Sequence, residues 1–371
     1  MDRLAAKYKS TNLLSGLSDP LAELKSLETK NLKSDKEDNF ELSAMFQTSS
    51  LSGKEQKNVE AQMKSWNFDQ SQFGSTDLAT FAAVILVKNN VDVFLGIAAI
   101  RLCQFCIEVE RSYKLVPYHN FRHGFTVMHI TGRLLSQAAL GGSPPLNASY
   151  RSALLLSSLC HDIFHDGRTN AFHVSSQSNT ALEYSSESTL EHMHVAKTMS
   201  AIKDLRLFEG MRGAEAQALR KNMTILILST DMKMHNEVME YGSLIQIKRT
   251  KRGSHEKQLK LSKMIIHCAD ISNPTMSPAL SHYWSSKVLE EFTLQIEEEE
   301  TLGIQQSLYL KAKKGSVEEA KLHRGFITTF VLPSWLVLQQ VFPPHSIYVY
   351  VQAIQENIQY WDDRVAALTT T

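Results

Sequence analysis

The sequence predicts an all-α protein. Apolar residues recur at helical spacing through most of the chain after residue 75, and strand-like composition is confined to residues 243–248 and 347–351. Neither stretch has an evident partner strand, so we expect helices to form almost the whole body. The chain has 371 residues, 43% of them hydrophobic, which is enough to bury a substantial core.

Capping and breaking residues indicate where the helices begin and end. Ser75 to Asp77 supply capping oxygens before an apolar run, which predicts a helix start. The helical pattern continues to Tyr113 with an interruption near Asn89-Asn90, and the polar residues 166–188 should form loops with short helical turns. The other expected helices cover residues 127–134, 149–165, 190–207, 214–231, 258–270, 284–302 and 324–341, and Pro343-Pro344 precedes a final segment ending at Trp361.

Residues 1–55 are expected to form a flexible or weakly ordered N-terminal segment, because they are rich in Ser, Lys, Asp and Glu. Three leucines between residues 21 and 27 lie at helical spacing, which leaves open a short helix that docks on the body or on a partner. Trp66-Asn67-Phe68-Asp69 marks the expected beginning of ordered structure. Residues 56–371 should then form one domain.

The charge pattern excludes some classes of partner. Lys and Arg together number 39, as do Asp and Glu, so no global field favours nucleic acid or an anionic membrane. The acidic residues 297–300 and the basic stretch 311–314 are most simply solvated surface. No apolar run approaches the roughly 20 residues that a membrane span needs.

The cysteine content indicates a reducing, cytoplasmic setting. Four cysteines in a chain of this length argue against a disulfide scaffold. Cys103 and Cys106 form a C-x-x-C pair, but they lie at helical spacing with Ile100 and Ile107, and no second pair completes a zinc site. We therefore expect buried thiols in the core.

One stretch, residues 160–170, has the composition of a metal site. His161 and Asp162 are adjacent and His165 follows one helical turn later, which places two imidazoles and a carboxylate together. A buried, hydrogen-bonded histidine explains most lone histidines, so this stretch alone is only suggestive. Matching parts elsewhere, His119 to His123 and Asp270, favour a divalent cation.

Five motifs follow one another along the chain. They are Tyr118-His119-Asn120-Phe121-Arg122-His123, the stretch His161 to Asn170, Glu191-His192-Met193-His194, Thr230-Asp231-Met232 and His267-Cys268-Ala269-Asp270-Ile271-Ser272-Asn273-Pro274. In this set the chain resembles the catalytic domain of class I cyclic nucleotide phosphodiesterases, a subset of the HD-type metal phosphohydrolases, from Trp66 to Trp361. The resemblance implies a compact multi-helix bundle with a central binuclear metal pocket, within a catalytic domain of residues 56–371.

The resemblance implies an activity, two cofactors and a set of site residues. The activity is hydrolysis of 3′,5′-cyclic nucleotides, cAMP and/or cGMP, to nucleoside 5′-monophosphates by a hydroxide that bridges two metal ions, with His119 as general acid. Asp162 would bridge a zinc ion to a second ion, magnesium or manganese. The implied zinc ligands are His123, His161, Asp162 and Asp270, and the residues implied around the second ion are His165, Glu191, Thr230, Asp231 and His194.

Some of these roles have alternatives. Asp231 is expected to orient either His119 or the water around the second ion. For Glu191 and His194 the alternative to a place around the second ion is a role as salt-bridged core groups.

The nucleotide pocket departs from the family pattern. Phe326 retains the aromatic clamp, whereas His323 replaces a glutamine whose amide hydrogen-bonds the purine in relatives. A neutral imidazole cannot offer a paired donor and acceptor on one edge. Asn273 and Tyr118 are also expected in the substrate pocket, and Met193 replaces a histidine of the family's polar network.

Two other readings of the same residues stay open. The first is a catalytically weakened phosphodiesterase-like module that senses nucleotide or binds a partner, and the changes at Met193 and His323 favour it. The second is a phosphohydrolase of the same metal chemistry that acts on a different phosphoester. The expected partner is a small-molecule cyclic nucleotide, and a homodimer or a regulatory domain outside this chain is left open.

Overall fold

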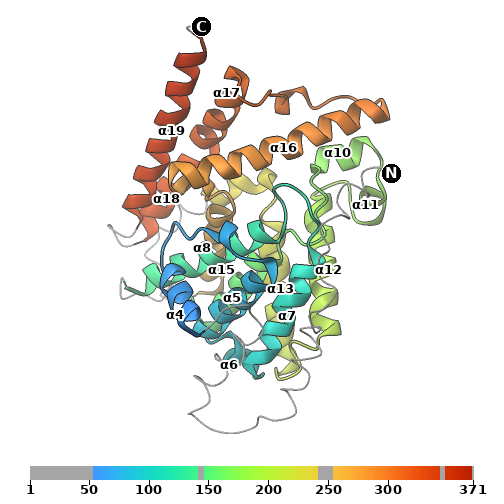
Figure 1. Ribbon diagram of the computed structural model, residues 1–371. Coiled ribbons are helices and arrows are strands. Elements are labelled where there is room, and N and C mark those ends of the chain that lie inside the picture. The colour runs from blue at the N-terminus through green and yellow to red at the C-terminus, as the bar shows by residue number, and fades with distance from the viewer. Residues whose placement is uncertain (1–52, 141–145, 241–253, 343–346, 370–371) are drawn as a thin grey trace.

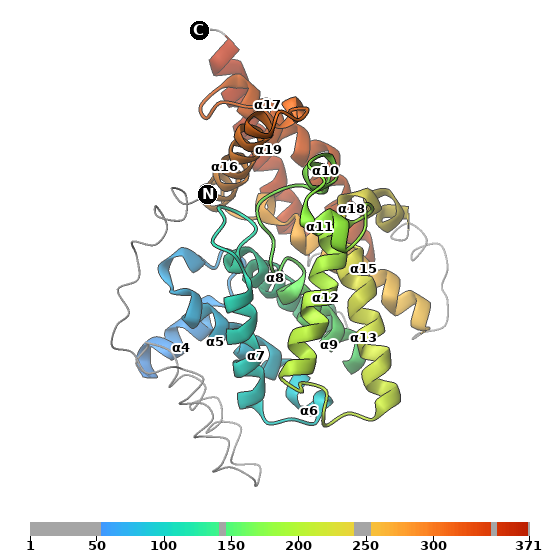
Figure 2. The ribbon, with the colours of Figure 1, turned by 90° about the vertical axis from the view of Figure 1, so that its right-hand side faces the viewer.

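The computed structural model describes residues 53–140, 146–240, 254–342 and 347–369, and every element in these ranges is helical. The all-α prediction is confirmed, and the helices pack into a compact bundle (Figures 1 and 2). In chain order they are α4 (Gly53–Gln62), η2 (Gln70–Gln72), α5 (Ser75–Lys88), α6 (Val91–Leu95), α7 (Ala99–Ser112), α8 (Phe121–Leu140), α9 (Ala148–Cys160), α10 (Asn170–Ser175), α11 (Asn179–Glu183), α12 (Thr189–Asp204), α13 (Gly213–Leu228), η3 (Met232–Met234), α15 (His255–Asp270), η4 (Asn273–Thr275), α16 (Pro278–Leu302), η5 (Leu308–Leu310), α17 (Val317–Phe326), the π-helical turn η6 (Ile327–Val331), α18 (Leu332–Val341) and α19 (Tyr348–Thr369).

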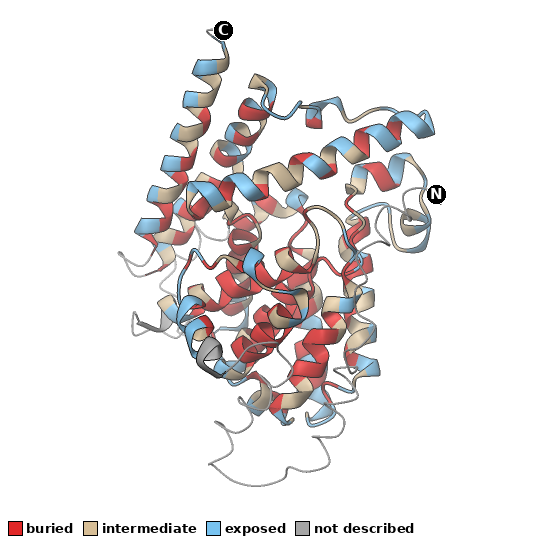
Figure 3. Ribbon diagram, viewed as in Figure 1, coloured by how far each residue is buried: buried red, intermediate tan, exposed pale blue. Residues whose placement is uncertain are grey.

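Helix α9 forms the centre of the core and leads directly into the site. It packs against α8, α13 and α15, and all its residues from Ser152 to Cys160 are buried. A helix that is buried all round belongs in a core rather than on a surface, and Figure 3 shows the buried residues gathered in the interior of the bundle. Since α9 ends at Cys160, the next two residues, His161 and Asp162, are held at the inner edge of this core.

Some of the expected element boundaries agree with the structure. The expected helix 149–165 is wrong in its last turn, because α9 ends at Cys160 and Phe164 has a left-handed backbone, so His161 and His165 do not share a helical face. Helix α5 begins at Ser75 with Gly74 as its N-cap, and the Asp77 carboxylate accepts the Gly74 N–H at 3.3 Å. Asn90, at the expected interruption, has a left-handed backbone with φ of 58°. The polar residues 166–188 contain only the short helices α10 and α11, as expected.

Residues 347–351, despite their strand-like composition, lie at the beginning of helix α19, as the prediction of an almost wholly helical body requires. Ile347, Tyr350, Val351 and Ile354 are buried, whereas Tyr348 and Val349 are exposed. That spacing is helical, and the β-branched composition reflects packing against the core rather than a strand. The other strand-like stretch, 243–248, lies outside the described residues.

Ordered structure begins earlier than expected. Helix α4 starts at Gly53, before Trp66 and across the expected boundary at residue 55, while residues 1–52 lie outside the described part. Trp66 stacks on Tyr350 of α19, with ring centroids 3.6 Å apart, and meets Trp335 of α18 edge-on. These contacts join the beginning of the described chain to its last two helices. Nowhere in the described ranges is a helix long and apolar enough to cross a membrane.

The acidic run 297–300 is not uniformly solvated. Glu299 is 1% exposed and accepts hydrogen bonds from Gln295, from the Ser307 amide and from the Ser307 hydroxyl. The other three glutamates of the run are exposed, as are Lys311, Lys313 and Lys314. Glu299 therefore connects α16 to the chain that follows it.

Candidate active site

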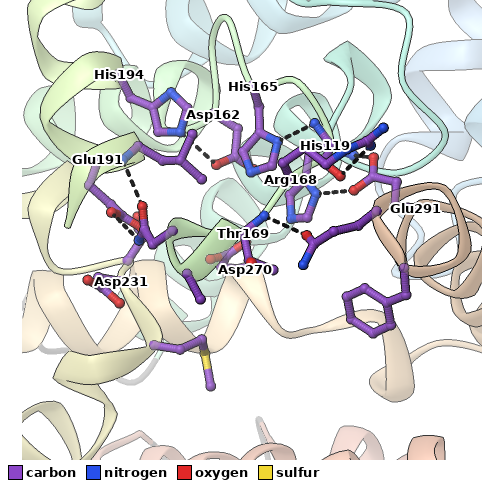
Figure 4. A pocket seen from close by; sticks show the side chains of 18 residues that line it. His119, Asp162, His165, Arg168, Thr169, Glu191, His194, Asp231, Asp270 and Glu291 are labelled. Carbon is purple, nitrogen blue, oxygen red and sulfur yellow. Dashed lines mark hydrogen bonds and ion pairs between the residues drawn. The ribbon is translucent and has the colours of Figure 1, made fainter. Parts of the chain in front are cut away.

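A polar cavity of about 300 Å³ lies between α16 and the core helices. Figure 4 shows its side chains, with His119 and Glu291 toward one end and Glu191 and Asp231 toward the other. Five carboxylates line it, which makes it a strongly acidic cavity that suits cations. The lining residues are His119, Asp162, His165, Gly167, Arg168, Thr169, Asn170, Ala171, Leu190, Glu191, His194, Thr230, Asp231, Met232, Asp270, Glu291, Phe292 and Gln295.

The four residues predicted to hold a metal ion meet beside this cavity. His123 comes from α8, His161 and Asp162 follow α9, and Asp270 ends α15. Asp270 Oδ1 lies 3.0 Å from His123 Nε2 and 3.1 Å from His161 Nε2. Asp162 Oδ2 lies 3.3 and 3.1 Å from the same two nitrogens. One ligand atom from each residue is thus close enough to share a single ion.

The hydrogen bonds of this cluster fit a cation at its centre. His161 Nδ1 lies 3.0 Å from the Ser158 carbonyl, so it carries a proton, and Nε2 is the ring atom that faces the cluster. The His123 and His161 Nε2 atoms are 3.3 Å apart. Burial opposes charge on His161, yet Asp162 and Asp270 raise its pKa well above the ordinary value. The cluster therefore stabilises positive charge, as a divalent metal would supply.

A second group, formed by Asp162, His165 and His194, lies next to the first. His194 Nδ1 donates to the Ile163 carbonyl at 2.6 Å, which leaves Nε2 as an acceptor 3.6 Å from Asp162 Oδ1. Burial lowers the pKa of His194 to about 4, so the ring is neutral at pH 7. His165 Nδ1 instead accepts the Gly167 N–H at 2.9 Å, which leaves Nε2–H as a donor. The group thus offers a carboxylate, an acceptor and a donor to an ion and its water.

His119 is held by Glu291, a residue that the sequence reasoning missed. His119 Nδ1 lies 2.6 Å from Glu291 Oε2, and Glu291 Oε1 accepts the backbone N–H groups of Tyr118 and His119. Burial disfavours the charged ring, but the Glu291 carboxylate raises the pKa of His119 to about 9. Gly167, with φ of +75°, allows this contact because a Cβ there would lie 3.3 Å from the Glu291 carboxyl carbon.

Two further carboxylates occupy the other end of the cavity. Glu191 accepts a hydrogen bond from Asn170 at 2.9 Å, and burial together with nearby Asp231 raises the pKa of Glu191 to about 7. Asp231 accepts the Ser188 hydroxyl at 2.7 Å and the Lys233 N–H at 2.9 Å. Of the two roles expected for Asp231, orientation of the water around the second ion stays a prediction, since Glu291 is the carboxylate that contacts His119 Nδ1.

Comparison with known proteins assigns the chain to a family. A model of the family described as 3′5′-cyclic nucleotide phosphodiesterase matches residues 118–353, which contain the metal cluster and the His119–Glu291 pair. The chain belongs to the 3′,5′-cyclic nucleotide phosphodiesterase family.

Individual relatives agree with this assignment. A 3′,5′-cyclic-AMP phosphodiesterase, isoform F, of Drosophila melanogaster is 29% identical over 259 residues, which cover 67% of this chain and 38% of the relative. A cGMP-specific 3′,5′-cGMP phosphodiesterase 3 of Dictyostelium discoideum is 26% identical over 298 residues, 77% of this chain and 62% of that protein. The chain therefore spans less than two thirds of either relative.

A solved structure gives the same result for the fold. The phosphodiesterase domain of the RhoPDE fusion protein from the choanoflagellate Salpingoeca rosetta superposes with a TM-score of 0.78 and 25% identity. The similarity covers 85% of this chain and 99% of that domain. The helical bundle around the cavity is thus the phosphodiesterase fold.

The four residues predicted from the family pattern to bind substrate are not among those that line the described cavity. Tyr118 is buried beside His123, and its hydroxyl accepts a hydrogen bond from Asn273 at 2.6 Å. His323 is 7% exposed and packs against Trp361, with ring centroids 4.9 Å apart. Phe326 is 39% exposed. The substrate-binding role of these residues stays a prediction.

Proposed function

We propose that this chain hydrolyses 3′,5′-cyclic nucleotides, cAMP and/or cGMP, to nucleoside 5′-monophosphates. The observation that carries the proposal is the convergence of His123, His161, Asp162 and Asp270 on one point beside the His119–Glu291 pair. Membership of the phosphodiesterase family supports the same reaction. The fold brings cation ligands and a proton donor to one cavity, which are the two requirements of phosphodiester hydrolysis.

The donor sets support a different ion on each side of Asp162. Zinc bonds to imidazole and carboxylate at about 2.0–2.1 Å in a tetrahedron, whose ligands are then about 3.3 Å apart. The measured separations of 3.0 to 3.3 Å between His123, His161, Asp162 and Asp270 atoms fit such an ion. The far side of Asp162 faces two imidazoles and a cavity that is also lined by Glu191, Thr230 and Asp231, and the oxygen atoms of these three residues suit magnesium or manganese. When bound, two such ions polarise the phosphoryl oxygens and lower the pKa of a bound water.

The residues around these sites have distinct tasks. Asp162 faces both groups of ligands, so its two oxygens suit a bridging role. His165 offers a donor and His194 an acceptor, and these would orient water next to the second ion. Glu191 and Thr230 line the same end of the cavity and would hold further water. Water held in this way would be the nucleophile that attacks phosphorus.

His119 would supply the proton that the leaving group needs. Its Nδ1 is engaged by Glu291, so a protonated ring keeps Nε2–H available for O3′ of the nucleotide. With a pKa of about 9, the ring carries that proton at neutral pH. Glu291 then stabilises the acid form and keeps the ring from turning.

Glu291→Gln is expected to move the basic limb of the pH profile of kcat to lower pH. The active form is protonated His119, and activity is lost as pH rises through its pKa. Removing the carboxylate lowers the pKa of His119 from about 9, so activity should be lost at lower pH than in the wild type. We expect a loss of about threefold at pH 8.5 if the pKa falls by about one unit, and a loss that approaches tenfold at higher pH.

The measurement is a pH series of kcat for the wild type and the variant. Glu290→Gln is a matched control, because Glu290 is a neighbouring glutamate on α16 that is exposed and bonded to Lys287. Identical basic limbs for wild type and Glu291→Gln would refute the role of Glu291.

His323→Gln is expected to strengthen purine nucleotide binding. His323 Nε2 is buried and has no hydrogen-bond partner among the described residues, and burial lowers the pKa of His323 to about 4. An amide would restore a paired donor and acceptor worth roughly 1–3 kcal/mol, or about tenfold to a hundredfold in Kd. The check is calorimetric binding of 5′-AMP and 5′-GMP. His282→Gln is the control, because His282 is exposed and also packs against Trp361, and unchanged or weaker binding by His323→Gln would place base recognition elsewhere.

A substrate panel tests the proposal against its alternatives. Purified chain with Mg²⁺ or Mn²⁺ is assayed with cAMP, cGMP and bis(4-nitrophenyl) phosphate, and binding of the cyclic nucleotides is measured in parallel. Turnover of cAMP or cGMP supports the phosphodiesterase. Binding of either without turnover would indicate the sensing module, and turnover of the aryl ester alone would indicate a different phosphoester as substrate.

A further inference from the structure

Between His165 and α10 the chain forms one wall of the cavity. This wall is held by His173, a histidine that the proposed reaction does not use. Residues 167–171 line the cavity, and the chain on either side of them is joined through His173. His173 Nε2 lies 3.2 Å from Asp166 Oδ1, and His173 Nδ1 lies 2.8 Å from Ser178 Oγ. The side chain of His173 is 2% exposed, whereas that of Asp166 is 33% exposed.

We call the three residues Asp166, His173 and Ser178 the clip. Their side chains satisfy one another's hydrogen-bonding groups. Ser178 Oγ accepts the Ala181 N–H as the N-cap of α11, so its own hydrogen is available to His173 Nδ1. His173 Nε2–H can then donate to the Asp166 carboxylate. The backbone adds the Ser178 N–H to His173 carbonyl bond, at 3.1 Å. Each buried polar atom of the clip therefore has a partner, which favours one rigid arrangement.

The cavity wall is also fixed from the opposite side. The Thr169 N–H donates to Gln295 of α16 at 2.9 Å, and Arg168 forms an ion pair with Glu298 at 2.6 Å. Asn170 bonds both Glu191 and the Leu190 N–H. The wall thus has contacts to α16 and α12, and the clip supplies the contact to the chain that leads into α11. Losing the clip frees one of the three attachments.

We propose that His173 is a positioning residue for the active site: the Asp166–His173–Ser178 clip holds the wall of residues 167–170 so that Asn170 keeps Glu191 in place and Gly167 stays against Glu291. The kinetic part of this inference rests on the proposed function. The trio has the residue types of a hydrolase triad, but Ser178 uses a lone pair to cap α11, and no described cavity opens on it. The clip therefore acts by keeping the wall of residues 167–170 in one conformation.

The test compares His173→Leu with wild type by hydrogen–deuterium exchange and by steady-state kinetics. We expect faster exchange in peptides covering residues 166–178, with no change elsewhere. We also expect kcat/KM to fall about tenfold, as loss of two hydrogen bonds predicts, and mainly through kcat. His173→Gln retains one arm and should recover part of the loss, and Asp166→Ala should reproduce it. His129→Leu is the matched control, because His129 is also buried and, within the described part of the chain, its hydrogen bond is to the Met63 carbonyl.

The two measurements separate this inference from the proposed function. Unchanged exchange in His173→Leu would overturn the clip, whether or not the wild type turns over cyclic nucleotides. Faster exchange with unchanged kinetics in an active wild type would overturn the positioning role. An inactive wild type would refute the proposed function and would leave the exchange result to decide whether the clip orders the wall. Labelling of Ser178 by a fluorophosphonate probe would replace the positioning role with a nucleophilic one.

Discussion

Asp162→Asn is expected to lower the turnover of cyclic nucleotides by at least about a thousandfold, equivalent to about 4 kcal/mol of transition-state stabilisation. Asp162 contacts both imidazoles of the first group through Oδ2 and faces His194 through Oδ1. Asparagine has nearly the same shape but lacks the negative charge, so it cannot bridge two cations. Metal content should fall by at least one ion per chain.

The measurement pairs elemental analysis of the purified variant with steady-state kinetics over a titration of Mg²⁺ and Mn²⁺. Asp363→Asn serves as the control, since Asp363 is an exposed aspartate of α19 that bonds only Gln359 among the described residues. Wild-type activity in Asp162→Asn, with the full complement of metal, would refute the bridging role.

His119→Ala is expected to lower kcat for cyclic nucleotides by roughly 10²–10⁴-fold, the usual contribution of a general acid. The side chain of His119 is 29% exposed, so its removal should leave the fold intact. The effect should nearly vanish with bis(4-nitrophenyl) phosphate, because a nitrophenolate leaves without needing a proton.

The ratio of the two losses is therefore the informative quantity. An equal loss with both substrates would mean that His119 acts on water or on metal binding rather than on the leaving group. His192→Ala, an exposed histidine of α12, controls for the substitution itself.

The helical fold could be predicted because it depends on local spacing, whereas the four ligands of the metal cluster, which are far apart in the sequence, were predicted from the resemblance to the family's motifs. Ser152 to Cys160 are buried because they belong to one apolar helix. The His161-Asp162 pair directly follows this helix and is therefore also buried. Residues 347–351 show that composition alone does not distinguish a strand from a helix. β-branched residues suit a buried face of either element, and the helical spacing of the buried residues is what identifies α19.

The contacts that complete the site depend on which helix faces which, and one sequence does not contain that information. Glu291 shares a helical face with Trp284 and Gln295, all buried, and this spacing was the one signal that could have identified it. His173 carried no such signal, since its partners Asp166 and Ser178 lie in loops. His323 was placed in the substrate pocket by family pattern alone, and it packs against Trp361 instead of lining the described cavity.

The most direct test of the central claim is ³¹P NMR of cAMP and cGMP incubated in ¹⁸O-labelled water with the purified chain and Mg²⁺ or Mn²⁺. We predict nucleoside 5′-monophosphate with one ¹⁸O on phosphorus, because water attacks phosphorus and the bond to O3′ breaks. An unlabelled product, a 3′-monophosphate, or no product from protein that contains its metal would contradict the phosphodiesterase account.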